Sequence, residues 1–310
     1  MPSTHMRRTD LAGKAFIGAA REVLLLFSAM RPADWVKNVF VVAPLFFSGQ
    51  AAVFDKVALT GIVVVAFCAM SSAVYLFNDI NDREHDRLHE KKRHRPIASG
   101  ELSTGLAASA ASILAILSIA IVGFSWKVVG VLVCYGVINV AYSLWTKHVV
   151  IVDVISIAMG FVLRVFAGGL AIEVTPSSWL ILATFLLSLF LGLAKRRHEL
   201  FLMRTDANSH RPVLEEYSIK LVDELISVVT PVTLLTYILY TLDEKTIHHF
   251  RSEHLYVTSL FVVFGIFRYL YLVHRKDLGG SPTDLVVKDI PLVLSILGWI
   301  SAFLLIVYLS

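Results

Sequence analysis

The stretch at residues 57–86 reads VALTGIVVVAFCAMSSAVYLFNDINDREHD. Its first part is almost entirely apolar and is long enough to cross the hydrocarbon core of a bilayer as one helix, which takes about 20 residues. The polar side chains of Asn78, Asp79, Asp82 and Asp86 follow at once. Ionisable groups at a membrane span are functional by default. The stretch therefore predicts a span that ends in a chemical site.

Similar apolar windows recur along most of the 310 residues, of which 56% are hydrophobic and 17% charged. A soluble domain carries about 25% charged residues, so lipid is the expected solvent. We expect an all-α, polytopic membrane protein with one catalytic domain at 31–310, after a tail or interfacial segment at 1–30. About nine spans are expected, at 33–49, 57–80, 104–124, 127–146, 149–172, 178–200, 222–242, 255–274 and 290–309.

Basic residues predict the orientation of these spans. Most of the 28 Lys and Arg residues fall in the N-terminal tail and the even-numbered connections, whereas the opposite connections hold only Lys56, Lys127, Lys245 and Arg251. The positive-inside rule places the basic side in the cytoplasm. Ser310 is then expected outside. Membrane lipid is the expected surface partner, nucleic acid is not, and the long basic connections are expected to form ordered caps.

The acid row favours a metal site. If the helix continues, Asn78, Asp82 and Asp86 repeat every four residues and share one face, with Asp79 at its edge. Magnesium prefers oxygen ligands and commonly joins one or two carboxylates to substrate phosphates. We therefore predict Asn78, Asp82 and Asp86 as metal ligands and catalytic residues. The alternative is a solvated acidic helix end with arginines nearby.

Two basic clusters are candidates for binding phosphate. Arg95, next to Pro96, can grip phosphate through two parallel hydrogen bonds. Lys195 and Arg196 end the sixth apolar run, and Lys195 shares a helix face with Glu199. The alternative is that such clusters only orient the spans by the positive-inside rule and contact anionic lipid. The acid row next to the first cluster favours phosphate binding.

Three further polar residues lie within or at the ends of apolar runs. Arg164 is inside the fifth run, where a buried cation is costly without an anion. A substrate anion or an internal ion pair, for example with Asp153, would satisfy it. Tyr142 and Lys147 end the fourth run, where snorkelling toward the interface is the competing explanation.

The motif Asn78-Asp79-x-x-Asp82-x-x-x-Asp86 resembles the first aspartate-rich motif of the UbiA superfamily of intramembrane prenyltransferases, a family of nine-helix bundles. Six further segments resemble its decaprenyl-phosphate phosphoribosyltransferase branch in particular. Two of them are Ser72-Ala73-Val74-Tyr75-Leu76, and Arg268-Tyr269 before the loop with Gly279-Gly280. The other four are Arg31-Pro32-x-x-Trp35-Val36-Lys37-Asn38, Arg95-Pro96-Ile97-Ala98-Ser99-Gly100, Arg164-x-x-Ala167-Gly168-Gly169 and Lys195-Arg196-x-x-Glu199-Leu200.

The choice of branch has a physical argument. Other members of the superfamily resemble one another in a second aspartate-rich motif near the sixth span, where this chain has Lys195, Arg196 and Arg197. A phosphoribosyl diphosphate donor carries an extra phosphate, and a polyprenyl phosphate acceptor brings another anion. These groups would repel strongly at low dielectric, so bases suit this site better than acids.

The resemblance implies an Mg²⁺-dependent pentosyltransferase that moves 5-phosphoribose from phosphoribosyl diphosphate to a decaprenyl-like polyprenyl phosphate. It further implies a site on the cytoplasmic side of a bacterial inner membrane and a role in cell-envelope glycan precursor synthesis. The expected substrate-binding residues are Lys37, Asn38, Asp79, Arg95, Tyr142, Lys147, Arg164, Lys195, Arg196 and Glu199.

Two other functions are weighed against this one, and assembly into a homo-oligomer stays open. The first alternative is a prenyltransferase of the same superfamily that attaches an isoprenoid to an aromatic acceptor. The second is a transporter, which predicts ionisable groups near the bilayer midplane and broken helices. The polar clusters of this chain instead crowd one interface, which favours an enzyme.

Overall fold

The computed structural model describes residues 18, 20–90, 92–205, 214, 216–276, 278–280 and 282–309. Within these ranges the regular structure is helical throughout and contains no strand, which confirms the all-α prediction. The predicted tail at 1–30 lies largely outside the described residues, although 20–29 form a helix.

Eight helical segments of the described chain are long and apolar enough to cross a membrane, so the protein is a multi-pass membrane protein. They match the last eight predicted spans to within a few residues. The segments are α3 (Phe54–Asn81), α6 (Thr104–Ile121), α7 (Trp126–Leu144), α8 (Val152–Ala171), α9 (Ser178–Thr205), α10 (Ile219–Leu242), η5 (His254–Thr258) with α12 (Ser259–Arg275), and α14 (Ile290–Leu309).

The first predicted span, 33–49, is not one continuous helix. It folds as a 3₁₀ helix, η1 (Pro32–Val41), followed by the short α2 (Ala43–Phe47). A 3₁₀ helix rises about 2 Å per residue, so η1 covers more of the membrane than an α-helix of equal length. Its backbone lies against α8, where a Cβ on Gly168 would come within 1.9 Å of the Val41 carbonyl oxygen. This close backbone contact is a tertiary feature that hydropathy does not report.

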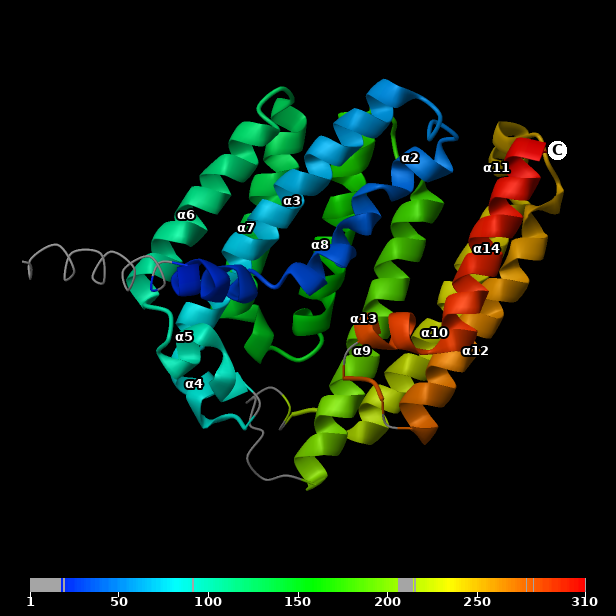
Figure 1. Ribbon diagram of the computed structural model, residues 1–310. Coiled ribbons are helices and arrows are strands. Elements are labelled where there is room, and N and C mark those ends of the chain that lie inside the picture. The colour runs from blue at the N-terminus through cyan, green and yellow to red at the C-terminus, as the bar shows by residue number, and fades with distance from the viewer. Residues whose placement is uncertain are drawn as a thin grey trace, which may run out of the picture.

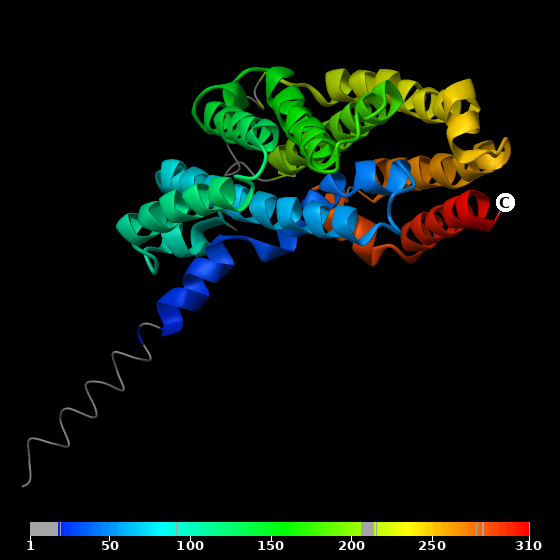
Figure 2. The ribbon, with the colours of Figure 1, turned by 90° about the horizontal axis from the view of Figure 1, so that it is seen from above.

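The helices form two groups around separate apolar cores. The first group, α3, α6, α7 and α8 with η1, surrounds a core that includes Phe67 and Leu132. The second, α9, α10, α12 and α14, surrounds a core that includes Phe190 and Ile226. Helices α8 and α9 pack against each other and join the groups (Figure 1). Figure 2 shows residues 20–29 leaving the bundle on the side away from α10 and α14.

The two ends of the bundle differ in their connections. At one end, the segment after α3 forms α4 (Arg83–Leu88), η2 (Lys92–His94) and α5 (Pro96–Ser99), which pack together as the ordered cap expected there. The C-terminal ends of α3 and α9 both lie at this end (Figure 1). The opposite end carries α2, α11 (Glu244–Phe250) and the end of α14. The short α13 (Pro282–Lys288) precedes α14 and contacts η1.

Candidate functional site

The acid row lies where α3 passes into α4. Asp82 is the junction residue, yet the helical hydrogen-bond spacing continues through it, with Asp82 N–H donating to Asn78 O and Asp86 N–H to Asp82 O, each at 2.8 Å. Asn78, Asp82 and Asp86 therefore remain on successive turns. Asp79 and Asp86 are buried, whereas Asn78 and Asp82 are half-buried.

Asp79 and Asp86 share one guanidinium. Arg95 Nη1 lies 3.1 Å from Asp79 Oδ1 and 2.5 Å from Asp86 Oδ2. Arg31 Nη2 also donates to Asp79, and its guanidinium lies over the ring of Tyr75, 4.9 Å from the centroid. Two carboxylates seven residues apart are thus neutralised by bases from the cap and from the start of η1. Lys92 Nζ stands 3.9 Å from Asp86.

Asn78 and Asp82 face the end of α7 instead. Ser143 Oγ donates to Asn78 Oδ1 at 2.9 Å, and Lys147 Nζ, on η3 (Thr146–His148), lies 2.5 Å from Asp82 Oδ1. The acid row therefore divides into two pairs, each with its own basic or hydroxyl partners. Sequence spacing alone places these side chains on one stripe and does not show this division.

The donor set fits a magnesium ion. Asp79 and Asp86 each place an oxygen within 3.1 Å of the same nitrogen, so both carboxylates can reach one cation. Magnesium is commonly bound through one or two carboxylates together with substrate phosphates. Within the described ranges, no group of three or more His, Cys, Asp or Glu side chains has metal-binding geometry. Substrate oxygens would complete the shell, and the ligand set Asn78, Asp82 and Asp86 stays a prediction.

The base-rich end of α9 forms a closed network. Arg196 is 2% exposed and donates from Nε to Asp153 Oδ2 at 2.6 Å, from Nη1 to Glu199, and from Nη2 to the Tyr142 hydroxyl at 3.2 Å. Asp153 is fully buried in the first turn of α8. Every nitrogen of this guanidinium already has a protein acceptor. Arg196 thus joins α9 to α7 and α8, and its binding of phosphate stays a prediction.

Tyr217 completes this network from the connection before α10. Its hydroxyl donates to Asp153 Oδ1 at 2.8 Å and accepts from the Ile151 N–H at 2.6 Å. Burial raises the pKa of Tyr217, so the hydroxyl stays protonated at neutral pH and remains a donor. Ile151 has φ +69°, an unfavourable value for a β-branched residue. Tyr217 thus holds the strained start of α8 in place.

Helix α7 connects the acid row to the α9 network. Tyr142 accepts from Arg196, and the next residue, Ser143, donates to Asn78. Because these two residues are consecutive, a shift of the α7 end would move both clusters. The Tyr142 hydroxyl accepts from Arg196, which leaves its own proton free to donate to a substrate oxygen.

Arg164 does not pair with Asp153, which was one of the two predicted outcomes. Asp153 bonds to Arg196, and Arg164 lies eleven positions further along α8, about 16 Å along a helix. Arg164 is 4% exposed; its Nε donates to Asn38 Oδ1 at 2.8 Å and its Nη2 to the Tyr135 hydroxyl at 3.0 Å. Its guanidinium also lies over the Tyr135 ring, 4.7 Å from the centroid.

The buried Asn38 is therefore a ligand of Arg164, and Lys37 beside it pairs with Asp34 at 2.6 Å. Arg164 thus anchors η1, the element that presents Lys37. Within the described part of the chain, no carboxylate pairs with Arg164. Its positive charge is held by carbonyl, amide and hydroxyl oxygens and by aromatic faces.

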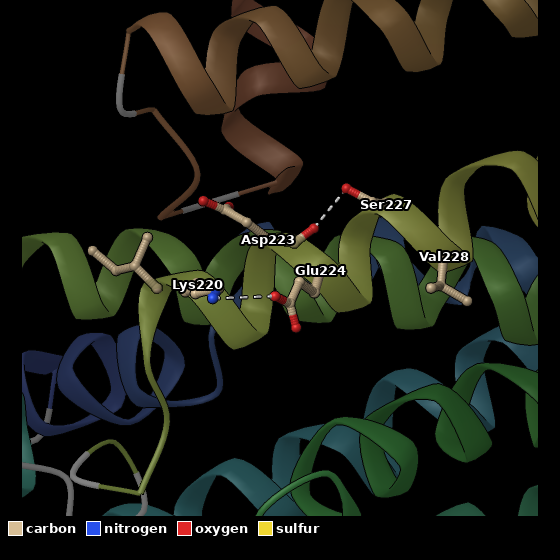
Figure 3. A pocket seen from close by; sticks show the side chains of 6 residues that line it. Lys220, Asp223, Glu224, Ser227 and Val228 are labelled. Atoms are coloured by element: carbon tan, nitrogen blue, oxygen red, sulfur yellow. Dashed lines mark hydrogen bonds and ion pairs between the residues drawn. The ribbon is translucent and has the colours of Figure 1, made fainter.

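The remaining bases of α9 reach other neighbours. Lys195 is half-buried one residue before Arg196. Arg197 Nε donates to Asp223 on α10 at 2.7 Å, and its Nη1 donates to the Val273 carbonyl on α12. Asp223 also lines a shallow hollow of about 640 Å³ whose lining residues all belong to α10 (Figure 3). A hollow lined by one helix does not form part of the acid–base site.

Four residues of these clusters were not among the predicted site residues: Arg31, Ser143, Asp153 and Tyr217. Arg31 entered the sequence analysis only as part of a motif, and Asp153 only as a possible partner of Arg164. Arg31 and Asp153 carried a usable signal, since each is an ionisable residue at the edge of an apolar run. Ser143 and Tyr217 carried none, because hydroxyl residues at helix ends are common and their partners lie far away in sequence.

These features define a helical intramembrane protein whose polar site lies at one end of the bundle. Residues 38–283 match the model of the UbiA prenyltransferase family. The chain is 30% identical to the decaprenyl-phosphate phosphoribosyltransferase of Corynebacterium glutamicum, covering 92% of this chain and 87% of that protein. It is 32% identical to that of Mycobacterium tuberculosis strain H37Rv, covering 88% and 91%.

A solved structure of a UbiA homolog from Archaeoglobus fulgidus, bound to DMAPP and Mg²⁺, has the same fold. Its TM-score is 0.67 at 17% identity, over 93% of this chain and all of that one. The chain belongs to the UbiA prenyltransferase family.

Proposed function

We propose that this protein transfers 5-phosphoribose from phosphoribosyl diphosphate to a polyprenyl phosphate and releases diphosphate. The activity for which its relatives are named supports this proposal, because the relatives match it over most of both chains. The structural observation that carries it is the junction at α7. There Tyr142 and Ser143 tie the base-rich end of α9 to the acid row of α3, at the same end of the bundle.

Magnesium would be held by the acid row, with Asp79 and Asp86 as the converging pair and Asn78 and Asp82 beside them. When bound, the ion neutralises charge that develops on the diphosphate leaving group. Among relatives of this fold, the Archaeoglobus fulgidus homolog is bound to Mg²⁺. The homolog shares the fold at 17% identity, so the assignment in this chain rests on its own oxygen donors.

The bases beside the acid row would receive the phosphate groups of the substrates. Arg95 and Lys147 sit within 2.5 Å of the carboxylates of Asp86 and Asp82. When substrate phosphates bind together with a cation, Arg95 and Lys147 would pair with the phosphates, and the cation would pair with the carboxylates. Arg95 can bind phosphate in the bidentate manner that a guanidinium allows.

The reaction needs no protein nucleophile. As the C1–O bond of ribose breaks, C1 becomes oxocarbenium-like, as in glycoside cleavage. The acceptor phosphate oxygen is already anionic and attacks the opposite face, so the configuration at C1 inverts. The chain would supply orientation and fixed charges, which is the main form of electrostatic catalysis. Tyr142 and Lys37 are the candidates for orienting the sugar and the lipid phosphate.

We further propose that the site faces the cytoplasm of a bacterial inner membrane. The cap of α4, η2 and α5 carries a dense group of Lys and Arg residues, and the positive-inside rule assigns such connections to the cytoplasm. Cysteine accessibility labelling in intact cells and in inverted vesicles would test this. A cysteine at Arg93 should react only in inverted vesicles.

The decisive experiment supplies purified protein with phosphoribosyl diphosphate labelled in the ribose and with polyprenyl phosphate. We expect a labelled lipid that forms only with Mg²⁺ and that disappears when the acceptor is omitted. A parallel reaction with an isoprenyl diphosphate and an aromatic acid tests the related prenyltransferase activity. Prenylated aromatic product without a labelled phosphoribosyl lipid would refute the proposal.

A further inference from the structure

A second cavity lies at the end of the bundle opposite the acid row. Its volume is about 500 Å³, and its walls come from α2, the α8–α9 connection, the end of α10 and α11. Ligand sites usually measure about 300–1,000 Å³. The first residues of α9 line the cavity, and Glu199 of the α9 network is 21 residues further along the same helix. That is about 30 Å, the thickness of the hydrocarbon core.

The walls of this cavity are aromatic. Phe47, Trp179, Tyr240 and Phe250 all line it, and the rings of Phe47 and Tyr240 meet edge to face with centroids 5.9 Å apart. Tryptophan and tyrosine are enriched at the level of the lipid head groups, where one end of the ring is apolar and the other wet. The cavity therefore lies at the membrane–water boundary of the opposite leaflet.

One carboxylate and one ammonium group also line the cavity. Asp243 and Lys245 flank the start of α11, and Asp243 is half-buried while Lys245 is exposed. Within the described part of the chain, neither side chain forms an ion pair. Asp243 would repel a ligand that carries only negative charge, and Lys245 would repel one that carries only positive charge. A ligand with both charges satisfies both residues.

We propose that this cavity holds the head group of a zwitterionic phospholipid from the leaflet opposite the catalytic site. Lys245 binds the lipid phosphate, and Asp243 binds its ammonium group, which also meets the aromatic faces of the wall. Val174 and Leu180 form the apolar part of the lining beside the acyl chains. This inference does not depend on the proposed reaction.

Such a lipid would add to the aromatic contacts that already join the elements around the cavity, such as that between Phe47 of α2 and Tyr240 of α10. Helix α11 follows α10, whereas α2 and the α8–α9 connection belong to the other half of the bundle. A ligand that binds only the folded protein stabilises it by mass action. We therefore expect the zwitterionic lipid to raise the melting temperature without changing the metal requirement of the catalytic site.

The test uses the full-length purified protein and native mass spectrometry after exchange into equal mixtures of phosphatidylethanolamine and phosphatidylglycerol. The wild type should retain phosphatidylethanolamine about fivefold more than phosphatidylglycerol, the factor expected for one charge contact near the membrane surface. Asp243→Asn should lose this preference, because the anionic lipid no longer meets a carboxylate. Lys245→Gln should weaken retention of both lipids.

Lys127→Gln is the matched control, since Lys127 is an exposed lysine on the same membrane face that does not line the cavity. Its lipid retention should equal that of the wild type. Circular dichroism and the melting temperature in detergent show that each variant is folded. Equal retention of the two lipids by the wild type overturns the proposal. Unchanged selectivity in Asp243→Asn, or preferential retention of polyprenyl phosphate, also overturns it.

Discussion

The acid row at the end of α3 and the base-rich end of α9 solve the same electrostatic problem in opposite ways. At the junction of α3 and α4, the acids are neutralised by bases from three other elements, and the side chains of these bases are 17–27% exposed. At α9, Arg196 and Asp153 are both almost wholly buried, and each is bonded on several sides. The first cluster can exchange its partners for a metal ion and phosphates, whereas the second cannot without breaking the fold.

This difference indicates that the first cluster binds substrate and the second stabilises the fold. Partly exposed bases such as Arg95 and Lys147 can turn from a carboxylate to a substrate phosphate at little cost. Breaking a buried pair such as Arg196–Asp153 leaves an uncompensated charge. We therefore expect variants of the first cluster to lose activity while staying folded. Variants of the second should lose stability and activity together.

The largest expected effect is that of Asp82→Asn on turnover. The substitution keeps the shape of the side chain but removes a negative charge from the acid row, next to Asn78 and Lys147. We expect kcat to fall by about 10³-fold, the upper end for removal of one electrostatic catalytic group. The labelled-donor assay measures it, and the melting temperature should stay within about two degrees of the wild-type value.

Glu84→Gln is the matched control for this variant. Glu84 lies two residues further along, is 72% exposed and pairs with Arg87. Its loss should leave kcat within twofold of the wild type, because surface pairs contribute little. Wild-type turnover in Asp82→Asn would remove the acid row from the mechanism, and equal losses in both variants would point to a nonspecific charge effect.

The next effect is on stability, at the α9 network. Arg196→Met should destabilise the protein by about 3–5 kcal/mol, because Asp153 is then left charged and buried. The double variant with Asp153→Leu should recover most of that loss, since an apolar pair can replace a buried ion pair. Reversible unfolding in mixed micelles measures both.

Measuring the activity of these variants then distinguishes a purely structural role of Arg196 from a role in positioning Tyr142. If Arg196 works only by holding Tyr142, the double variant should be stable but slow, with Tyr142→Phe alone causing a similar fall in kcat. A fully active double variant would show that the position of Tyr142 is irrelevant. A single variant as stable as the wild type would contradict the closed-network description.

The contrast between the clusters also shows what could be predicted from the sequence. Apolar runs of sufficient length located the eight long spans, and the polar residues from Asn78 to Asp86 marked one end of the bundle. Hydropathy could not show that 33–49 divides into η1 and α2, nor that the η1 backbone approaches α8 closely at Gly168, because it reports no tertiary contact. The sequence also did not show which side chains pair with each other. The ion pair of Arg196 with Asp153 could not be predicted, because the two residues are 43 positions apart.

A smaller effect is expected at Arg95, and it tests whether the acid row exchanges partners. Arg95→Ala should raise the KM for phosphoribosyl diphosphate by about 10–100-fold, the usual cost of losing a group that supports a metal site. Without Mg²⁺ it should also lower the melting temperature, because the buried carboxylates of Asp79 and Asp86 lose the cation they share. Arg95→Lys should recover only part of the loss, because one ammonium cannot reproduce the bidentate grip of a guanidinium.

Arg93→Ala provides the matched comparison, as Arg93 is an exposed arginine of the same basic cap. Its KM should match that of the wild type. If both variants raise KM equally, the cap acts through its overall charge, and Arg95 has no specific role. Raising the salt concentration would then reduce both effects together, because exposed charges are screened.

The smallest effect is expected from Tyr217→Phe, which removes one hydroxyl from the closed network. Asp153 and the Ile151 N–H each lose a hydrogen bond, so the variant should be less stable by about 1–3 kcal/mol.

The effect of this variant should depend on pH. In the wild type, burial raises the pKa of the Tyr217 hydroxyl in the folded state. A raised pKa contributes stability that is fully present below the unfolded value, about 10, and is lost as the pH rises above it. The difference between variant and wild type should therefore be constant from pH 6 to pH 9 and shrink at higher pH. A difference that already shrinks near pH 7 would mean that the hydroxyl ionises there and does not donate to Asp153, and the closed network would lose its third member.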